Sequence, residues 1–209
     1  MINLHLGDCL EAMRQMPDKC YDLAIVDPPY DIHKHGAKTG GKGKLKDRAF
    51  CRGKYEHWDK SPSQEYFDHL FRVSKNQVIW GANYFTLPST RCVVCWDKCQ
   101  PWPNFSQWEM AWTSFSYPAK LFKFDNRTGD KIHPTQKPTA LYRWILEHFA
   151  KEGDKILDTH LGSGSIAIAC HEMGFSLDAW EIDKDYYTSA KKDWKHINNN
   201  NNFGDIVYI

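Results

Sequence analysis

The sequence lacks any long apolar run, and it also lacks an excess of charge of one sign. No stretch approaches the roughly 18 apolar residues of a membrane-spanning helix, and the N-terminus has no charged-then-apolar secretory pattern. Lys and Arg number 27 against 26 Asp and Glu, so the formal net charge of +1 does not by itself indicate nucleic acid. We therefore expect one compact domain of 209 residues in the cytoplasm.

The seven cysteines do not form a pattern that predicts disulfides or a metal site. In a cytoplasmic protein they are expected to be free thiols. Cys92, Cys95 and Cys99 have a spacing similar to that of zinc ligands, but residues 92–96 are typical of a strand, whose side chains alternate between faces. No fourth ligand is evident, so buried apolar thiols are the better interpretation and no metal is predicted.

The most informative motif is Asp27-Pro28-Pro29-Tyr30, which directly follows the apolar run 23–26. Proline has no backbone N–H, so the motif cannot continue a hydrogen-bonded strand, although its carbonyl groups still accept hydrogen bonds. The Asp27 carboxylate and the Pro28 carbonyl form a pair of acceptors beside the flat ring of Tyr30. An adenine extruded from a helix, planar and bearing an exocyclic NH2, fits these features. A proline-rich strand exit with a capping Asp is the alternative.

A glycine-rich turn later in the chain predicts a cofactor site. Residues 156–157 form a short buried strand, and Gly162 and Gly164 allow a tight turn close to a ligand. Ser165 is expected to cap a helix over 166–173.

The next strand, 177–180, ends at Glu181, about 20 residues past the glycines, where Rossmann-type folds bind ribose hydroxyls. The full dinucleotide fingerprint is absent, and an adenosine-bearing cofactor without phosphates fits equally well.

Positive charge gathers between residues 32 and 54, where six Lys and two Arg stand against one Asp, among five Gly. The segment has no helical or alternating apolar period and is expected to be a mobile loop. Because it follows Tyr30, we expect it to neutralise phosphates of a nucleic acid; a solvated surface loop is the alternative. The expected contacts are Lys34, Lys38, Lys42, Lys44, Lys46, Arg48, Arg52 and Lys54.

Strands that alternate with helices predict an α/β layered sheet. The expected strands cover 2–6, 23–26, 77–80, 92–96, 110–115, 156–157 and 177–180. The expected helices cover 9–16, 63–73, 138–150, 166–173 and 183–197, and the Asn run 198–202 is expected to be a turn or a frayed segment.

Three motifs together resemble the S-adenosylmethionine-dependent amino-methyltransferases that modify DNA. They are Asp27 to Tyr30, His133-Pro-Thr-Gln-Lys-Pro138, and Asp158 to Ser165. The catalytic tetrapeptide precedes the glycine turn, as in the circularly permuted β group of these enzymes. Asp in the first position of the tetrapeptide resembles the adenine-N6 enzymes, whereas Ser is more typical of cytosine-N4 enzymes. His160 departs from the family pattern, and we expect it at the surface or at the edge of the cofactor.

The resemblance implies a Rossmann-like, mostly parallel sheet of seven strands with an antiparallel hairpin at one edge. It implies a single domain over 1–209, with a mobile basic loop at about 32–57 and a recognition segment at about 97–132. The implied reaction is methyl transfer from S-adenosylmethionine to N6 of adenine in double-stranded DNA, by base flipping and direct displacement. The implied catalytic residues are Asp27, Pro28, Pro29 and Tyr30.

The family pattern also implies residues that hold the cofactor. Glu181 would bind the ribose, Asp158 the methionine amino group, and Asp8 the adenine amine, although Asp8 is equally suited to cap the helix that begins at Cys9. Thr135 and Lys137 would lie at the methionine end. The full set is Asp8, Cys9, Asp27, His133, Thr135, Lys137, Asp158, Leu161, Gly162, Ser163, Gly164, Ser165, Glu181 and Ile182.

Other functions stay open at this point. The same site geometry serves cytosine-N4 methylation of DNA, and methylation of RNA is a further alternative. A non-catalytic nucleic-acid-binding module is disfavoured, because such a module has no need of an acid and an aromatic ring at one strand end. The sequence leaves open whether the protein forms a homodimer or works with a partner nuclease, as in restriction-modification. A bacterial or phage-infected cell is the expected setting.

Overall fold

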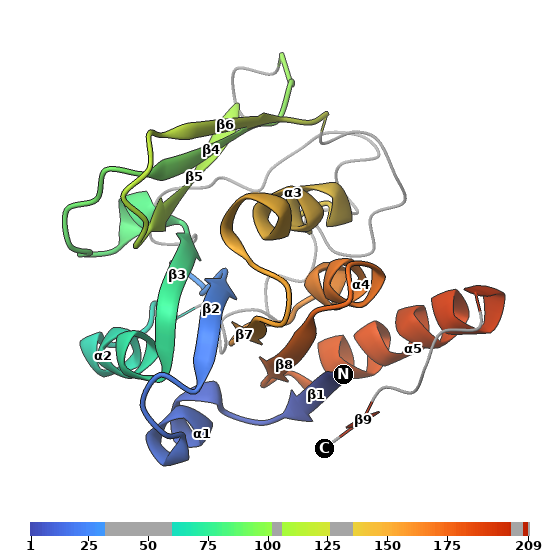
Figure 1. Cartoon of the computed structure of the whole chain (residues 1–209). Helices are drawn as coiled ribbons and strands as arrows, with labels where there is room; N and C mark the ends of the chain where they lie inside the picture. Colours follow the sequence, from blue (N-terminus) through green and yellow to red (C-terminus); the bar gives the residue numbers. More distant parts are fainter. Residues whose placement is uncertain (32–59, 102–105, 126–135, 202–206, 209) are drawn as a thin grey trace.

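The computed structural model describes residues 1–31, 60–101, 106–125, 136–201 and 207–208 (Figure 1). In these residues a twisted sheet is covered by helices on both of its faces. The helices are α1 (Cys9–Gln15), α2 (Gln64–Val73), α3 (Thr139–Phe149), α4 (Ser165–Glu172) and α5 (Lys184–Asn201), with a short 3-10 helix, η3, at Ala82–Tyr84. The strands are β1 (Ile2–Leu6), β2 (Tyr21–Val26), β3 (Ser74–Trp80), β4 (Val93–Asp97), β5 (Trp108–Thr113), β6 (Lys120–Lys123), β7 (Lys155–Asp158), β8 (Ser176–Glu181) and β9 (Val207–Tyr208).

The nine described strands form one sheet in the order β6-β4-β5-β3-β2-β7-β8-β1-β9. Only β5 runs against its neighbours, pairing antiparallel with both β3 and β4, while the other pairings are parallel. The predicted α/β class, the mostly parallel sheet and the antiparallel pair are confirmed. The predicted number of seven strands is wrong, because the short strands β6 and β9 extend the two edges of the sheet.

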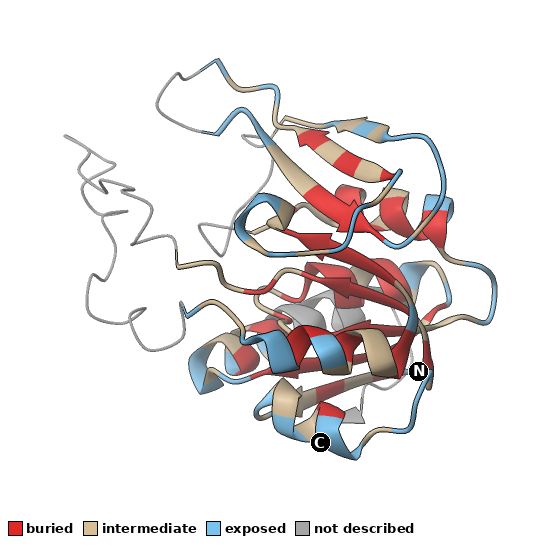
Figure 2. Ribbon diagram, turned by 90° about the vertical axis from the view of Figure 1, so that its left-hand side faces the viewer, coloured by how far each residue is buried: buried red, intermediate tan, exposed pale blue. Residues whose placement is uncertain are grey.

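The middle of the sheet is formed by β2 and β7, whose register pairs Leu23 with Ile156 and Ala24 with Leu157. Both strands are short apolar runs, as expected of parallel strands covered on both faces. Figure 2 shows that these central strands are buried. Because β2 and β7 are parallel neighbours, the motifs that follow them emerge at the same edge of the sheet.

Two apolar cores lie on the opposite faces of the sheet. One gathers side chains of α3 and α4, including Leu141, Ile145 and Ile166, against β-strand residues such as Trp80. The other gathers side chains of α1 and α2, including Met13. The α2 side chains in this second core lie on one face of the helix, which is therefore its core face.

The helix ends agree with the sequence in part. Asp8 caps α1, because its side chain accepts a hydrogen bond from the Leu10 amide at 2.7 Å. Ser165 does not cap α4: Gly164, in the left-handed region at φ 77°, holds the cap position and Ser165 is the first helical residue. The expected turn over 198–202 is corrected as well, because α5 continues through Asn201.

Several global expectations concern membranes, metals and compartments. No helix among the described residues is long and apolar enough to cross a membrane. Within the same residues, no group of three or more His, Cys, Asp and Glu side chains is placed to hold a metal ion. Cys92 is buried, Cys95 half-buried and Cys99 exposed, and all three are free thiols. A cytoplasmic location stays a prediction.

A buried carboxylate links the strands of the carboxyl-terminal half to β1 and β2. Asp178 on β8 accepts hydrogen bonds from Asn3 at 2.6 Å and from the Tyr21 hydroxyl at 2.9 Å, and pairs with the Lys155 ammonium at 2.7 Å. Burial alone would raise the pKa of Asp178, but hydrogen bonds from these groups and from His5 outweigh burial and lower it well below its usual range.

We predict that Asp178→Asn lowers the free energy of unfolding at pH 7 by about 2–4 kcal/mol, since it leaves buried donors poorly matched. A carboxyl whose pKa is lower in the folded state than in the unfolded state stabilises the fold at pH values above its ordinary pKa, near 4, and this contribution is lost in more acidic solution. The difference in the free energy of unfolding between the wild type and Asp178→Asn, measured by urea unfolding from pH 3 to 8, should therefore shrink in acid. Glu152→Gln, an exposed acid-to-amide change, is the control. A difference independent of pH would contradict the assignment.

Candidate active site

Four strands that lie side by side each lead into an acidic residue at the same edge of the sheet. Asp27 follows β2, Asp158 ends β7, Glu181 ends β8, and Asp8 lies two residues after β1. Carboxyl ends of parallel strands are where open α/β sheets bind ligands. The structure therefore brings together acids that are up to 173 residues apart in the chain, from Asp8 to Glu181.

The glycine turn and Glu181 are joined by hydrogen bonds. The Glu181 carboxylate accepts from the amides of Gly162 and Asp183, both at 2.9 Å. Gly162 and Gly164 both have left-handed φ values, 54° and 77°, which explains why glycine suits this turn. Burial raises the pKa of Glu181, although the two amides oppose the shift. The Glu181 carboxylate and the glycine turn, both predicted to belong to the cofactor site, thus lie in contact.

The other residues predicted near this turn are close to it in the structure. Leu161 is buried and its amide donates to the Trp180 carbonyl at 2.8 Å. The Ser163 and Ser165 hydroxyls lie 3.2 Å apart, and Ser165 accepts from the Gln136 side chain at 3.2 Å. Burial raises the pKa of Cys9 to about 12, so Cys9 stays a thiol.

Apolar side chains are exposed beside Glu181. Ile182, directly after β8, is 60 % exposed, and Leu6, paired with Glu181 in the sheet register, is 42 % exposed. Most exposed apolar residues need no explanation, but these two lie next to a buried carboxylate and a glycine turn. They provide an apolar surface of the kind on which a flat ring packs.

Asp158 is buried and has no cationic partner at hydrogen-bonding distance among the described residues. Its Oδ1 accepts from the His160 amide at 3.0 Å. Burial raises the pKa of Asp158 to about 8, and the carboxylates of Asp27 and Glu181 add to the shift. The same burial lowers the pKa of His160 to about 4, so its imidazole is neutral. The His160 ring is hydrogen-bonded to the Thr159 hydroxyl at 2.8 Å and is half-buried; its place at the edge of the cofactor stays a prediction.

Asp27 lies at one end of a row of four alternating charges. Its Oδ2 pairs with the Lys137 ammonium, which is also 3.2 Å from the Glu109 Oε2. The other oxygen of Glu109 pairs with the Lys98 ammonium. Lys137 is only 4 % exposed and lies over the Trp80 ring, 5.1 Å from its centroid. The sequence analysis placed Lys137 near the cofactor and did not find Glu109 or Lys98.

Burial and charge act against each other along this row. Burial raises the pKa of Asp27, and the Lys137 ammonium opposes that shift. Burial alone would lower the pKa of Lys137, but Asp27 and Glu109 outweigh it and raise the pKa above its usual range. Glu109 has a lowered pKa, because the ammonium groups of Lys137 and Lys98 outweigh its burial. Lys137 is therefore a permanent cation between two carboxylates.

The remaining oxygen of Asp27 is available for a ligand. Asp27 Oδ1 is buried and has no hydrogen-bond partner among the described residues. A buried acceptor without a donor is costly, so such an atom marks a place where a ligand donor fits.

The ring of Tyr30 is held by a second segment that the sequence analysis did not single out. It stacks on Tyr84 with centroids 4.4 Å apart and planes 3° from parallel. A Cβ built on Gly81 would lie 2.9 Å from the Tyr30 ring, and Gly81 has a left-handed φ of 72°. The sequence Gly81-Ala-Asn-Tyr84 directly after a buried strand is the signal that could have identified this segment.

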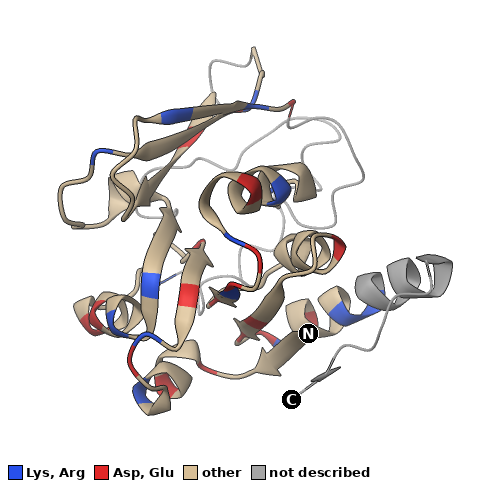
Figure 3. Ribbon diagram, in the orientation of Figure 1, with Lys and Arg blue, Asp and Glu red and all other residues tan. Residues whose placement is uncertain are grey.

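Some predicted site residues lie outside the described residues. They are His133, Thr135, and the basic residues Lys34, Lys38, Lys42, Lys44, Lys46, Arg48, Arg52 and Lys54. Figure 3 shows that the charges of both signs elsewhere are scattered over the helices and strand ends.

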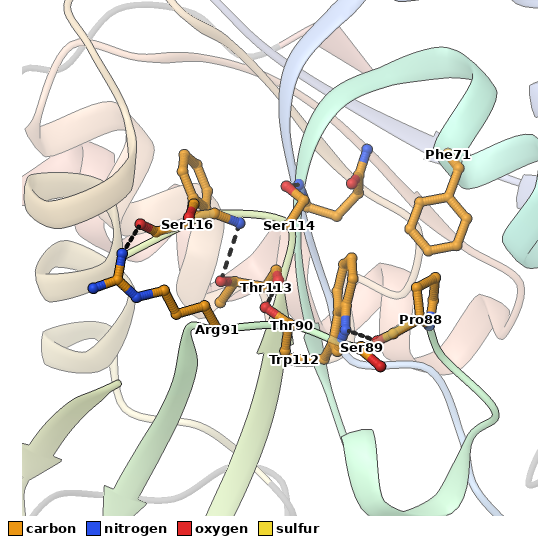
Figure 4. Close-up of a pocket in the computed structure, with 11 residues that line it drawn as sticks. Phe71, Pro88, Ser89, Thr90, Arg91, Trp112, Thr113, Ser114 and Ser116 are labelled. Carbon is orange, nitrogen blue, oxygen red and sulfur yellow. Dashed lines mark hydrogen bonds between the residues drawn. The ribbon is translucent and has the colours of Figure 1, made fainter. Parts of the chain in front are cut away.

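A hollow of about 410 Å³ lies away from these motifs, lined by side chains from β3, β5 and the segment before β4 (Figure 4). Gln77, Trp112 and Arg91 line it, and Arg91 donates to the Ser116 carbonyl at 3.4 Å. None of the predicted site residues contributes to this hollow. The candidate active site is therefore defined by its buried polar groups and not by this hollow.

Comparison with known proteins gives a consistent result. A family model described as DNA methylase matches residues 96–192. The type II methyltransferase M.HinfI of Haemophilus influenzae is 23% identical, with 97% of this chain and 71% of that protein covered. The type II methyltransferase M2.MboI of Moraxella bovis is 25% identical, with coverage of 80% and 78%. The predicted resemblance to DNA methyltransferases is confirmed.

Solved structures confirm the fold. The complex of M1.HpyAVI with SAM has a TM-score of 0.60 at 20% identity, and covers 93% of this chain and 99% of that one. The cytosine-N4-specific PvuII DNA methyltransferase has a TM-score of 0.63 at 13% identity, with coverage of 98% and 94%. The shared fold alone does not distinguish the two target bases.

The charge on Asp158 gives a stability prediction. A carboxyl whose folded-state pKa is raised to about 8 destabilises the fold as the pH rises from about 4 to 8, because the folded state holds its proton more tightly. Each pKa unit corresponds to about 1.4 kcal/mol, so the rise from about 4 to about 8 sets an upper limit of about 6 kcal/mol. Asp158→Asn should therefore be more stable than the wild type above pH 8 by up to about that amount, and about equally stable near pH 4. Thermal unfolding across this pH range measures the difference. A constant difference would show that Asp158 is ionised throughout.

Proposed function

We propose that the protein transfers a methyl group from S-adenosylmethionine to the exocyclic N6 of adenine in DNA. The observation that carries this proposal is the unpartnered, buried Oδ1 of Asp27, beside the Pro28 carbonyl that continues the motif and the aromatic ring of Tyr30. An amino group on a flat ring supplies the missing donors and a face to stack. The similarity to DNA methyltransferases supports the same reaction.

The residues around the glycine turn suit an adenosine-bearing cofactor. The Glu181 carboxylate is placed to accept from ribose hydroxyls, as an acid at this point does in Rossmann-type folds. A Cβ built on Gly162 would meet nothing closer than 3.9 Å, so the turn leaves room for a ligand. The exposed faces of Leu6 and Ile182 suit the adenine ring, and Asp8 would take its amine. When bound, S-adenosylmethionine would supply an activated methyl group on a positively charged sulfur.

The acids of the site also suit the charge of such a ligand. The cofactor bears a sulfonium and an amino group, and a buried carboxyl such as Asp158 is destabilised until a cation approaches it. We propose that Asp158 ionises when it receives the amino group. The predicted contacts of Lys137, Thr135 and His133 with the methionine end belong to the same proposal.

Asp27 and its neighbours would prepare the target amine. Asp27 Oδ1 and the Pro28 carbonyl each accept one N6–H, which draws the nitrogen lone pair out of the ring. The nitrogen would displace the sulfonium sulfur from the methyl carbon, so that the N–C bond forms as the C–S bond breaks and S-adenosylhomocysteine leaves as a neutral thioether. Asp27 would take the proton that the nitrogen loses. Pro29 keeps the backbone rigid because its ring fixes φ. Positioning and electrostatics supply most of the rate in such a site.

The stacking surface for the base is marked by Tyr84. Its ring is 42 % exposed and lies parallel to Tyr30, so a flat aromatic group fits against this face of Tyr30. We propose that the flipped base takes this place, with Tyr84 moving aside. Extrusion of the base is required because N6 is not accessible for this chemistry inside a duplex.

Adenine is favoured over cytosine by the acid in the first position of the tetrapeptide, as the sequence analysis described. The cytosine-N4 alternative uses the same acceptors and stays the second candidate. DNA contact by the basic segment 32–54 is also part of the proposal, and it should make binding sensitive to salt. Double-stranded DNA is the proposed form, and the possible homodimer and partner nuclease are left open.

Incubation of the protein with tritiated S-adenosylmethionine and unmethylated double-stranded DNA tests the proposal. Digestion to nucleosides and mass spectrometry then identify the product. N6-methyladenine is the expected result. If N4-methylcytosine is found instead, the target base is cytosine and the mechanism is unchanged. If no methyl group is incorporated into DNA although cofactor binding is intact, the proposed substrate is refuted.

Asp27→Asn should abolish transfer, with a loss of at least about 100-fold, because it removes the acceptor charge and the general base. Cofactor affinity should change little, since Asp27 faces the target amine. Calorimetric titration with S-adenosylmethionine and single-turnover methylation measure the two effects separately. Asp185→Asn, exposed on α5, is the control. Transfer close to the wild-type rate, or a loss of transfer that lost cofactor binding fully explains, would overturn the assignment.

A further inference from the structure

Glu109 is a half-buried acid on β5 that the proposed reaction does not use. It lies far from Asp27 in sequence, but a single ammonium group, that of Lys137, contacts both carboxylates. Its second oxygen is occupied by Lys98, which lies 5.3 Å from the centroid of the Trp96 ring. A row of four side chains from four separate segments thus ends at the catalytic Asp27.

We propose that Glu109 is a positioning residue of the methyl-transfer reaction, which shares the Lys137 ammonium with Asp27 and so keeps Asp27 a strong hydrogen-bond acceptor. The inference rests on the proposed function. Glu109 lies in the antiparallel part of the sheet, acts through Lys137 and does not touch the substrate.

Lys137 paired with Asp27 alone would weaken the remaining oxygen of Asp27 as an acceptor. A buried carboxylate in a one-to-one pair with an ammonium is strongly neutralised, and its oxygens are poorer acceptors for a further donor. With Glu109 present, its negative charge acts on Asp27 in the direction opposite to that of the same ammonium. The Asp27 carboxylate therefore keeps more negative charge on Oδ1, the oxygen that faces the target amine in the proposed reaction.

Lys98 makes the net charge of the four side chains zero. A second acid beside Asp27 with a single shared cation would leave one excess negative charge, which is costly in a largely buried site. The Lys98 ammonium compensates it, and two carboxylates then stand with two ammonium groups. Lys98 directly follows β4, and Glu109 lies opposite Trp96 of β4 in the sheet register. Antiparallel pairing of β4 and β5 therefore brings the two charges together.

Geometry also explains why Oδ2 and not Oδ1 receives the ammonium. The Lys137 side chain is almost fully buried, over the Trp80 ring and between the two acids, so it has little freedom to move to the other oxygen. The ion pair fixes the rotation of the Asp27 carboxylate, and Oδ1 is left without a partner among the described residues. Glu109 anchors the ammonium from its opposite side.

The first test compares Glu109→Gln with the wild type in methyl transfer. The amide keeps the shape and an acceptor oxygen but loses the charge, so Lys137 pairs with Asp27 alone. The kcat should fall about three- to tenfold, while KM for DNA and the Kd for S-adenosylmethionine stay within about twofold. Glu109→Asp should restore much of the kcat. Glu172→Gln, which removes the surface pair with Arg143, is the matched control. Equal kcat values for Glu109→Gln and the wild type would overturn the inference.

A pH profile separates positioning from a merely structural role. The charged groups that act on Asp27 are Lys137, Glu109 and Lys98, and the titratable groups Asp158, Tyr30, Tyr66 and Tyr142 are coupled to the same cluster. Removal of the Glu109 charge should move the acid limb of the kcat profile to lower pH, whereas Lys137→Met should move it to higher pH. Shifts of about one pH unit are expected. Shifts in the same direction would overturn the inference.

The closing experiment does not depend on activity. Carbon-13 NMR of the Asp27 side-chain carboxyl in the wild type and in Glu109→Gln follows its titration directly, with Asp27→Asn to assign the signal. A midpoint lowered by about one pH unit in Glu109→Gln is expected. An unchanged midpoint overturns the inference even if the wild type methylates DNA. A lowered midpoint in a protein that methylates no DNA would support the effect of Glu109 on Asp27 and refute the proposed function instead.

Discussion

The ion pair between Asp27 and Lys137 is the interaction on which the candidate site depends. Its partners are 110 residues apart in the chain. Lys137 is buried and Asp27 is half-buried, so each requires the other to offset the cost of leaving water. The pair joins the end of β2 to the segment before α3, and through Glu109 it reaches β5. The site is consequently a product of the whole sheet, and the tetrapeptide alone does not form it.

Much of this arrangement could be predicted from the sequence, because neighbouring residues alone determine several of its features. These features are the apolar run before Asp27, the glycines at 162 and 164 and the acid at 181. The structure places them at one edge of the sheet. The capping role of Asp8 was foreseen for the same reason. The fold class followed from the alternation of strands and helices, although the short edge strands β6 and β9 have too little pattern to be recognised.

The rest depends on contacts between distant segments. Nothing near Glu109 in the sequence indicates that its carboxylate shares a cation with Asp27, because that contact follows from the antiparallel placement of β5. Ser165 has the chemistry of a helix cap, yet the left-handed Gly164 took the position, since the turn before α4 requires that backbone shape. The Asn run was expected to be a turn or a frayed segment, but α5 continues through Asn201.

The close approach of Gly81 to Tyr30 has a consequence for the history of this sequence. Any side chain at 81 would collide with the ring, and the left-handed backbone there disfavours one in any case. The tetrapeptide and the Gly81-to-Tyr84 segment are therefore constrained to evolve as a unit: a relative with a larger residue at the position of Gly81 needs a smaller ring or a shifted backbone at the position of Tyr30. Paired variation at these two positions would distinguish relatives that keep this stacking surface from relatives that have rebuilt it.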